Sequence, residues 1–437
     1  MDLGKDNIRK LFIKYLIPAL CASVVTSFYY VADTMMIGHG VGEEGLIALN
    51  IVLPVFSPLY GIGYLFGIGG SVLMSVAKGR QDEEGANRIF STSLILMLAV
   101  GILVTVLLYG FRYEFCYFLG ADEDNIALVM EYAKHLFFWA WSFAMFPFML
   151  TFVRNDKNPK LAMLGSVTGS LTNVVLDYVF IFMWNMGLAG AIVATVVGNA
   201  LNILITCSHF LTKKNTMRFT IKGFAPKQIV PICVSGATSF LNELASGFVI
   251  LIFNWQILRY IGDTGIVVYS TITNTVLVTI AMCNGVGTAM QPIVSYNFGA
   301  GKRERIFSCK KMALWTSASM NAVLYVFIYL LAEQLIHLYV KPTEEVVLMG
   351  VPAVRIYFLC VFPMLVNIFY ATYFQSVVRG SWSFVISILR GFVCSVAMVL
   401  VLPMLFGGTG IWWATPVAET LTLIVTLYLA RRDINLK

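Results

Sequence analysis

The chain has 437 residues, of which 59% are hydrophobic and only 12% are charged, and its formal net charge is +7. A soluble domain carries about 25% charged residues, so the composition excludes a soluble protein and indicates a polytopic membrane protein. We expect the positive charge to reflect membrane topology and not nucleic-acid binding. The eight cysteines are scattered through apolar runs without a CxxC pair, and we interpret them as core residues.

Apolar runs recur along the chain, and each is long enough for the ~20 residues that a membrane-spanning helix needs. No alternation typical of a transmembrane barrel is present, which leaves a helical bundle as the spanning structure. The sequence therefore predicts an all-α integral membrane protein. Its twelve transmembrane helices are expected near residues 11–38, 46–77, 89–111, 126–152, 161–184, 188–211, 228–259, 263–298, 306–330, 346–378, 381–405 and 409–430.

The basic residues predict the orientation of these spans. Twenty-five of the 30 Lys and Arg fall on the side of the membrane that holds the N-terminus. The remaining five are Arg112, Lys134, Arg259, Lys341 and Arg355. By the positive-inside rule, both termini are expected in the cytoplasm. We expect a multi-pass protein of a bacterial-type cytoplasmic (inner) membrane, whose N-terminal segment is an uncleaved start to the first span.

The two halves of the chain resemble each other at an offset of about 220 residues. GLAGAIVATVV (187–197) aligns with GGTGIWWATPV (407–417), and Gly79 aligns with Gly299. Gly and Ala also recur in membrane helices for close packing, which is the alternative explanation. Parallel repeats of this kind are typical of transporters that alternate access between two bundles. The repeat predicts two six-helix lobes, with an N-lobe at 1–211, a cytoplasmic linker at 212–227 and a C-lobe at 228–437.

Two aspartates fall within predicted spans of the first half. Asp177 lies in an apolar segment with Asn173 one helical turn before it, and Asp33 lies near the end of the first span. Ionisable residues inside a membrane are costly and mark ion or substrate pathways, so we interpret both as functional. The alternative is that they only hydrogen-bond neighbouring helices together.

Several motifs, taken together, resemble the multidrug and toxic compound extrusion (MATE) transporters over essentially the whole chain. They are Pro18 with Asp33, NxxxDY at 173–178 followed by GLAGAIVAT, MQPIVSYNFGAG at 290–301 and VVRGS at 377–381. The resemblance implies two lobes forming a V and cation-coupled export of amphipathic or cationic organic compounds. It also implies a monomer in contact with membrane lipids, without a cofactor other than the coupling ion, H⁺ or Na⁺.

The resemblance places a cation- or proton-binding pocket at Asp33, Asn173, Asp177 and Thr195. Carboxylate, amide and hydroxyl oxygens suit a hard monovalent cation and suit a proton relay equally well. Pro18 lies inside the first span, where a proline removes a helix hydrogen bond, so it is either a hinge or a static kink.

The second half offers further candidates. Glu243 and Glu419 are candidates for a substrate or ion site, and pairing with Arg390 is the alternative for both. Tyr30, Met282, Met290 and Gln291 are candidates for lining a drug cavity, because Met and aromatic side chains suit promiscuous binding. The four histidines lie near predicted span ends without metal-ligand spacing, and no metal site is expected.

A drug:cation antiporter is the leading functional hypothesis. A flippase for lipid-linked oligosaccharides is the alternative, although few basic residues lie at membrane depth. An intramembrane aspartyl protease would need a GxGD motif, which is absent, so no enzyme is predicted. GxxxxGK[ST] is also absent, so ATP binding within this chain is not expected.

Overall fold

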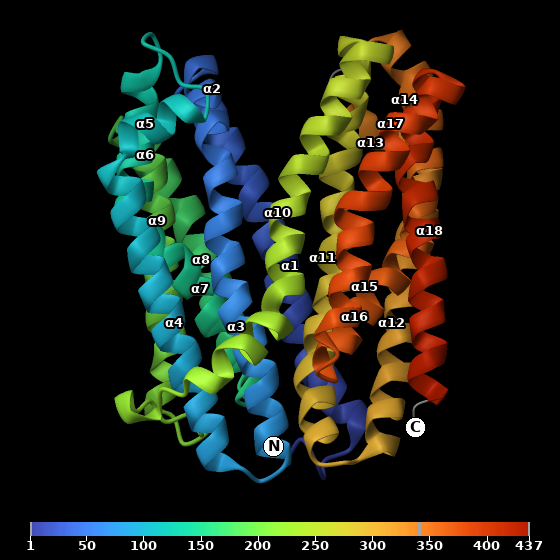
Figure 1. Cartoon of the computed structure of the whole chain (residues 1–437). Coiled ribbons are helices and arrows are strands. Elements are labelled where there is room, and N and C mark those ends of the chain that lie inside the picture. Colours follow the sequence, from blue (N-terminus) through green and yellow to red (C-terminus); the bar gives the residue numbers. More distant parts are fainter. Residues whose placement is uncertain (1, 340–341, 436–437) are drawn as a thin grey trace.

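The computed structural model describes residues 2–339 and 342–435, and its helices form two bundles that stand side by side (Figure 1). The N-terminal half contains α1 (Ile8–Gly40), α2 (Glu43–Val52), α3 (Phe56–Gly79), α4 (Glu83–Gly110), α5 (Arg112–Phe118), α6 (Ile126–Phe138), α7 (Ala140–Asn155), α8 (Pro159–Asp177) and α9 (Gly187–Cys207). The C-terminal half contains α10 (Ile229–Tyr260), α11 (Asp263–Gly299), α12 (Arg303–Leu330), α13 (Ala332–Tyr339), α14 (Glu344–Tyr357), α15 (Val361–Ser376), α16 (Gly380–Ile388), α17 (Cys394–Phe406) and α18 (Gly408–Asn435).

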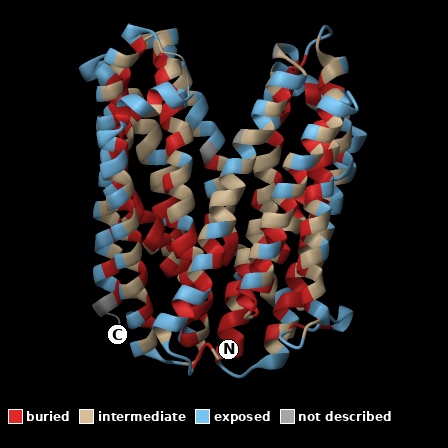
Figure 2. Ribbon diagram, turned by 180° about the vertical axis from the view of Figure 1, so that it is seen from behind, coloured by how far each residue is buried: buried red, intermediate tan, exposed pale blue. Residues whose placement is uncertain are grey.

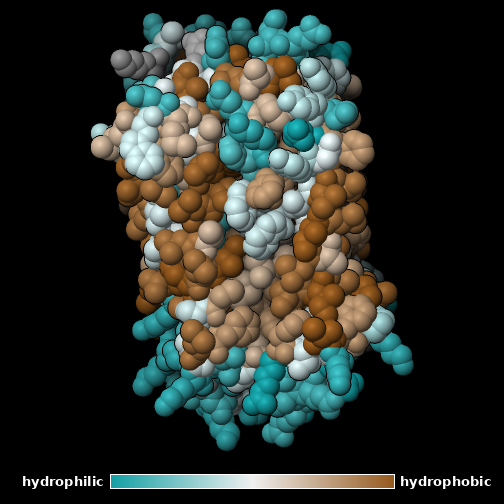
Figure 3. Space-filling model, turned by 90° about the vertical axis from the view of Figure 1, so that its left-hand side faces the viewer, coloured by the Kyte–Doolittle hydropathy of each residue, from teal (hydrophilic) through white to brown (hydrophobic). Residues whose placement is uncertain are grey.

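The predicted membrane-spanning helices are confirmed. In the described part of the chain, eleven helical stretches are long and apolar enough to cross a membrane, and the pair α6–α7, bent by 50°, makes a twelfth. Some spans are composite, since a π-helical turn interrupts the fifth span of each half, at Tyr178–Met183 and at Leu389–Val393. On the face of the N-terminal half, hydrophobic side chains form a band across the middle and hydrophilic side chains gather at both ends (Figure 3).

The backbone repeats as the sequence predicts. Residues with positive φ recur 220 positions apart in the two halves, as in the pairs Gly42 and Gly262, Gln81 and Gly301, and Gly187 and Gly407. Each pair lies at the break between equivalent spans, where the chain leaves one helix and enters the next. The two halves are therefore built by the same succession of helices and turns.

The bundles meet at the end of the molecule that holds both termini and separate toward the other end (Figures 1 and 2). At the closed end, each half inserts its first helix into the other. Leu11, Phe12 and Tyr15 of α1 belong to a hydrophobic core formed mainly by α11 and α15, and Ile232 of α10 belongs to the core around α3, α4 and α7. Further along, α1 packs against α8 in its own half. The first helix of each half therefore connects the two lobes.

Glycines permit the closest of these crossings. A Cβ atom added at Gly236 of α10 would lie 1.9 Å from the carbonyl oxygen of Leu65 in α3. A Cβ atom added at Gly79 of α3 would lie 2.1 Å from the carbonyl oxygen of Tyr296 in α11. Backbones can approach to this distance only where no side chain stands between them.

We expect Gly236→Ala to lower the thermal unfolding midpoint of the purified protein. The added methyl must push α10 away from α3, and such overpacking costs about 1–3 kcal/mol. Gly247→Ala on the same helix is the matched control, because a Cβ atom there meets nothing within 4 Å and only helix propensity changes. Equal thermal unfolding midpoints for the two variants would contradict a close contact between α10 and α3 at Gly236.

Candidate functional site

Two carboxyl groups face each other inside the N-terminal half. The carboxyl groups of Asp33 of α1 and Asp177, the last residue of α8, lie close enough to interact directly. Asp177 is fully buried, and no N–H or O–H group of the described residues other than the partner carboxyl reaches its oxygens or Oδ1 of Asp33. Two carboxylates in contact repel each other, so the pair needs a shared proton or a bound cation.

Local helix geometry explains why Asp177 lies at this point. The regular α-helix ends at Asp177, and the π-helical turn Tyr178–Met183 continues the span. Within this turn, the side chains of Ile181 and Phe182 pack against Gly40 at the end of α1. π-Helical turns inside α-helical spans occur frequently at functional sites, because they alter the direction of the side chains beside them.

Asn173 and Thr195 extend the carboxyl pair toward α9. Asn173 Nδ2 donates to Thr195 Oγ1 at 3.0 Å, and Thr195 Oγ1 donates to the carbonyl oxygen of Ala191 at 3.0 Å. The other side-chain atom of Asn173, Oδ1, has no donor. It is thus an oxygen that can accept from a protonated group or contact a cation.

Sequence reasoning missed Tyr132 of α6. It is buried, and it lies close enough to Asp33 and Asp177 to interact electrostatically with both. Tyr29 of α1 is similarly close to both aspartates. The sequence carries no sign of this role for Tyr132, because the tyrosine stands in an apolar span that packs against the rest of the lobe.

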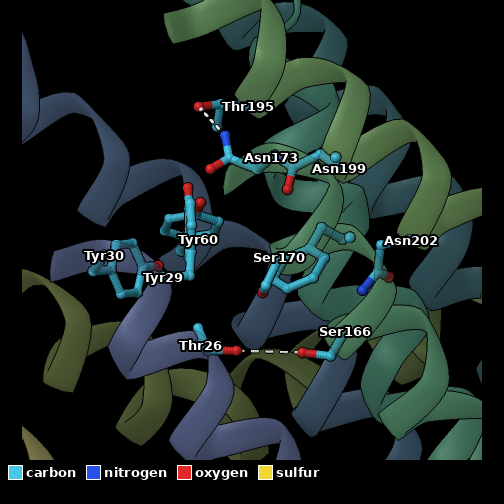
Figure 4. Close-up of a pocket in the computed structure, with 13 residues that line it drawn as sticks. Thr26, Tyr29, Tyr30, Tyr60, Ser166, Ser170, Asn173, Thr195, Asn199 and Asn202 are labelled. Carbon is cyan, nitrogen blue, oxygen red and sulfur yellow. Dashed lines mark hydrogen bonds between the residues drawn. The ribbon is translucent and has the colours of Figure 1, made fainter. Parts of the chain in front are cut away.

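A polar cavity lies between α1, α8 and α9 (Figure 4). Its volume of about 20 Å³ gives room for roughly one water molecule. In Figure 4, Asn173, Asn199 and Ser170 point toward the same space, and Thr26 and Ser166 are hydrogen-bonded at 3.3 Å below it. The other lining residues are Tyr29, Tyr30, Tyr60, Phe146, Gly169, Thr195, Gly198 and Asn202.

A second group of side chains lies where the two halves part. Tyr30 of α1 lies beside Tyr60 of α3, and Tyr64 lies one turn further along α3. Glu243 of α10 interacts electrostatically with Tyr30 and Tyr64, and its Cβ lies close to Gly61 of α3. Tyrosine rings beside a carboxylate form a suitable surface for an organic cation.

Glu419 lies in a different place from Glu243. Glu419 Oε1 accepts a hydrogen bond from Arg390 Nε at 2.5 Å, and Oε2 accepts one from Asn367 Nδ2 at 2.8 Å. Both contacts lie within the C-terminal half, whereas Glu243 faces α1 and α3 of the N-terminal half. The structure therefore does not bring Glu243 and Glu419 into one site. Glu419 forms an ion pair with Arg390 instead.

The four candidate cavity-lining residues differ in how far they are buried. The side chain of Tyr30 is 45% exposed and Met282 is half-buried, but Met290 and Gln291 are buried in the C-terminal half. In this conformation α1 and α3 cover α11 at Met290 and Gln291, so neither side chain is open to a space between the lobes. Pro18 lies inside the continuous helix α1, near the point where its packing changes from the C-terminal to the N-terminal core.

His209 and Asp156 form a buried cluster that the sequence did not indicate. His209 Nε2 donates to Asp156 Oδ2 at 2.8 Å, and Lys78 Nζ donates to Asp156 Oδ1 at 2.5 Å. Burial alone would raise the pKa of Asp156, but the hydrogen bond from His209, followed by the charge of Lys78, holds it well below its usual range. His209 is thus a fully buried residue, although it lies near the end of the sixth span.

Comparison with known proteins agrees with the fold. The MatE family model matches residues 18–179 and 238–405. The multidrug export protein MepA of Staphylococcus saprophyticus is 25% identical, over 98% of this chain and 95% of that protein. MepA of Staphylococcus aureus is 23% identical, over 97% of this chain and 93% of that protein. A solved multidrug resistance MATE family transporter in an outward-facing conformation has a TM-score of 0.92 at 23% identity, covering 99% of this chain and 97% of that chain. Because the family model spans most of both halves, this chain belongs to the MatE family, which comprises transporters and not enzymes.

Proposed function

We propose that this protein is a secondary active multidrug exporter that antiports amphipathic or cationic organic compounds against H⁺ or Na⁺. The observation that carries the proposal is the carboxyl pair Asp33–Asp177, which needs a proton or a cation and has no basic partner among the described residues. The likeness to MepA proteins supports organic drugs as the substrates. Export of this kind needs no cofactor besides the coupling ion.

The proposed mechanism alternates access between two lobes, at 1–211 and 228–437, joined by the linker 212–227. A cation or proton from outside neutralises Asp33 and Asp177, α1 bends near Pro18, and affinity for the bound organic cation falls. Linkage requires the drug to weaken cation binding by the same factor. The first helix of each half packs into the other half, and this supports coupling between cation binding and movement of the lobes. Helix α1 carries Asp33 and also packs against the opposite lobe.

The proposed orientation places both termini in the cytoplasm of a bacterial cell, so that the separated ends of the bundles face outward. The charge distribution along the sequence supports it, although Lys341 and Lys437 lie outside the described residues. We propose that the protein works as a monomer surrounded by lipid. The hydrophobic band in Figure 3 supports a lipid-facing surface on the N-terminal half.

Export of a lipid-linked oligosaccharide is the competing hypothesis within transporters. Binding a pyrophosphate group would require several unpaired Lys or Arg side chains between the lobes. Arg390, the basic residue nearest to the middle of a span in the C-terminal half, is bonded to Glu419. Glu243 also gives the surface at Tyr30 and Tyr64 a carboxylate suited to a cationic substrate, and Arg154 of α7 is the buried cation near Tyr64 on the side of the N-terminal half. Both observations favour the drug exporter.

Ethidium efflux from proteoliposomes tests the proposal. Purified protein is reconstituted, and a pH gradient and a Na⁺ gradient are imposed in separate experiments. Efflux driven by one gradient identifies the coupling ion. Absence of efflux under either gradient, from protein that elutes as a single folded species, would reject the exporter.

We expect Glu243→Gln to weaken ethidium binding about tenfold, which corresponds to about 1.4 kcal/mol. The substitution keeps the shape of the side chain and removes the negative charge beside Tyr30 and Tyr64. Fluorescence titration of the purified protein measures the affinity, with Glu123→Gln in an exposed loop as the control. An uncharged amphipathic dye should bind both variants equally. A loss of affinity for both dyes would indicate a structural role instead.

A further inference from the structure

A polar stripe follows one face of α9 through the interior of the N-terminal half. It consists of Thr195, Asn199, Asn202, Thr206 and, in the short helical turn after α9, His209. The spacing of four, three, four and three residues places these side chains on a single helix face. Thr195 bonds to Asn173 beside the carboxyl pair, and His209 bonds to Asp156 at the closed end. The stripe therefore spans the distance between two buried ionisable clusters.

Helix α8 presents a matching stripe to the same space. Its members are Asp177, Asn173, Ser170 and Ser166, again at spacings of four, three and four residues. Gly169 and Gly198 allow the two helices to touch, since a Cβ atom at either would lie 2.7 Å from the carbonyl oxygen of the other. Thr26 of α1 closes the third side through its hydrogen bond with Ser166. Polar groups from three helices thus surround the water-sized cavity, and the two stripes together with this cavity are called the path below.

Several of these polar groups are buried without a hydrogen-bond partner among the described residues. Asn202 is 1% exposed, and neither its Nδ2 nor its Oδ1 makes a hydrogen bond. Asn199 Nδ2 and Asn173 Oδ1 are also without a partner. Buried amides nearly always find a partner, so groups left over beside a water-sized cavity point to bridging water.

We propose that this path is a proton-release route, in which water and the side chains of α8 and α9 relay protons from the Asp33–Asp177 pair to the closed end of the N-lobe. The inference rests on the proposed antiport and deepens it by naming H⁺ as the ion that travels this path. Each step breaks one O–H or N–H bond and forms another, in water, in a hydroxyl group or in the imidazole of His209, while the amides hold the water in place. For each turnover one proton leaves the carboxyl pair, restoring its negative charge, and one proton enters the solution at the closed end.

The chemistry of the path favours a proton over a sodium ion. Between Asp177 and Asp156 it offers hydroxyl and amide groups, which both donate and accept hydrogen bonds. It offers no carboxylate to compensate a sodium ion that has lost its water. At the far end, Lys78 balances the charge of Asp156, and Asn158 Nδ2 lies 3.2 Å from His209 Nδ1. His209 therefore connects the path to a charge-balanced cluster next to the linker, where Thr216 also bonds to Asp156.

Replacing Asn202 by Leu interrupts the path at its midpoint. We expect Asn202→Leu to slow pH-driven ethidium efflux about tenfold and to slow proton release equally, measured with a pH dye in proteoliposomes. Ethidium binding and ethidium counterflow, which need no net proton release, should stay within twofold of the unchanged protein. Asn202→Ser, which restores a hydroxyl group, should recover most of the rate.

The matched control is Gln256→Leu in α10, which also removes a fully buried amide whose polar atoms are both without a partner. Equal efflux in Asn202→Leu and Gln256→Leu would overturn the route, as would a parallel loss of counterflow and efflux. If Asn202→Leu does not fold, Thr206→Val takes its place, since it removes one hydroxyl group at nearly constant shape. Its pH-driven efflux and its counterflow are then compared in the same way. Absence of efflux from the unchanged protein would instead reject the exporter itself.

Discussion

Gradient-driven ethidium efflux should fall about a hundredfold in Asp177→Asn. This factor is near the upper end of the factors by which one bound ligand typically changes the affinity for another. Asparagine has the shape of aspartate but neither ionises nor carries a transferable proton. Its amide can donate a permanent hydrogen bond to Asp33, the carboxyl that faces it. The variant therefore resembles the protonated pair at every pH and should remain in the state of low drug affinity.

Folding should survive this change, because the buried side chain keeps its volume and gains a donor for Asp33. Asp124→Asn, in an exposed loop, is the matched control and should transport normally. Efflux, ethidium affinity and elution from a sizing column should be compared for both variants. If Asp177→Asn still exports ethidium at the rate of the control under the same gradient, the carboxyl pair is not the coupling site.

The second large effect is expected at the ion pair of the C-terminal half. Arg390→Met should destabilise the protein by about 3–5 kcal/mol, because it leaves the buried carboxylate of Glu419 without its cation. The double variant Arg390→Met with Glu419→Gln should recover most of that loss, since it removes both charges and keeps the amide of Asn367 bonded. Denaturant unfolding of the purified variants measures the difference.

Arg432→Met on the exposed surface is the control for removing a positive charge. If Arg390→Met is as stable as this control, then the ion pair contributes nothing to folding. A recovery of Arg390→Met by added Na⁺, but not by choline, would show that Arg390 occupies the place of a cation.

The sequence alone determined the class of the protein, its spans and its repeat. These depend on hydropathy, on helical periodicity and on the spacing of glycines, which are local properties of the chain. The same periodicity placed Asn173 and Asp177 on one face of a helix. The 220-residue offset aligned Gly187 with Gly407, and the positive φ values at both positions agree with that alignment.

The tertiary structure alone decided which polar side chains meet. Glu243 lies beside Tyr30 and Tyr64 because α10 crosses onto α3, and no pattern within either helix indicates that crossing. Met290 is buried because α1 inserts into the C-terminal core and covers it. His209 reaches Asp156 only through the packing of α7 and α9. A buried polar group takes its partner from whichever helix lies against it, and that choice depends on the arrangement of the whole bundle.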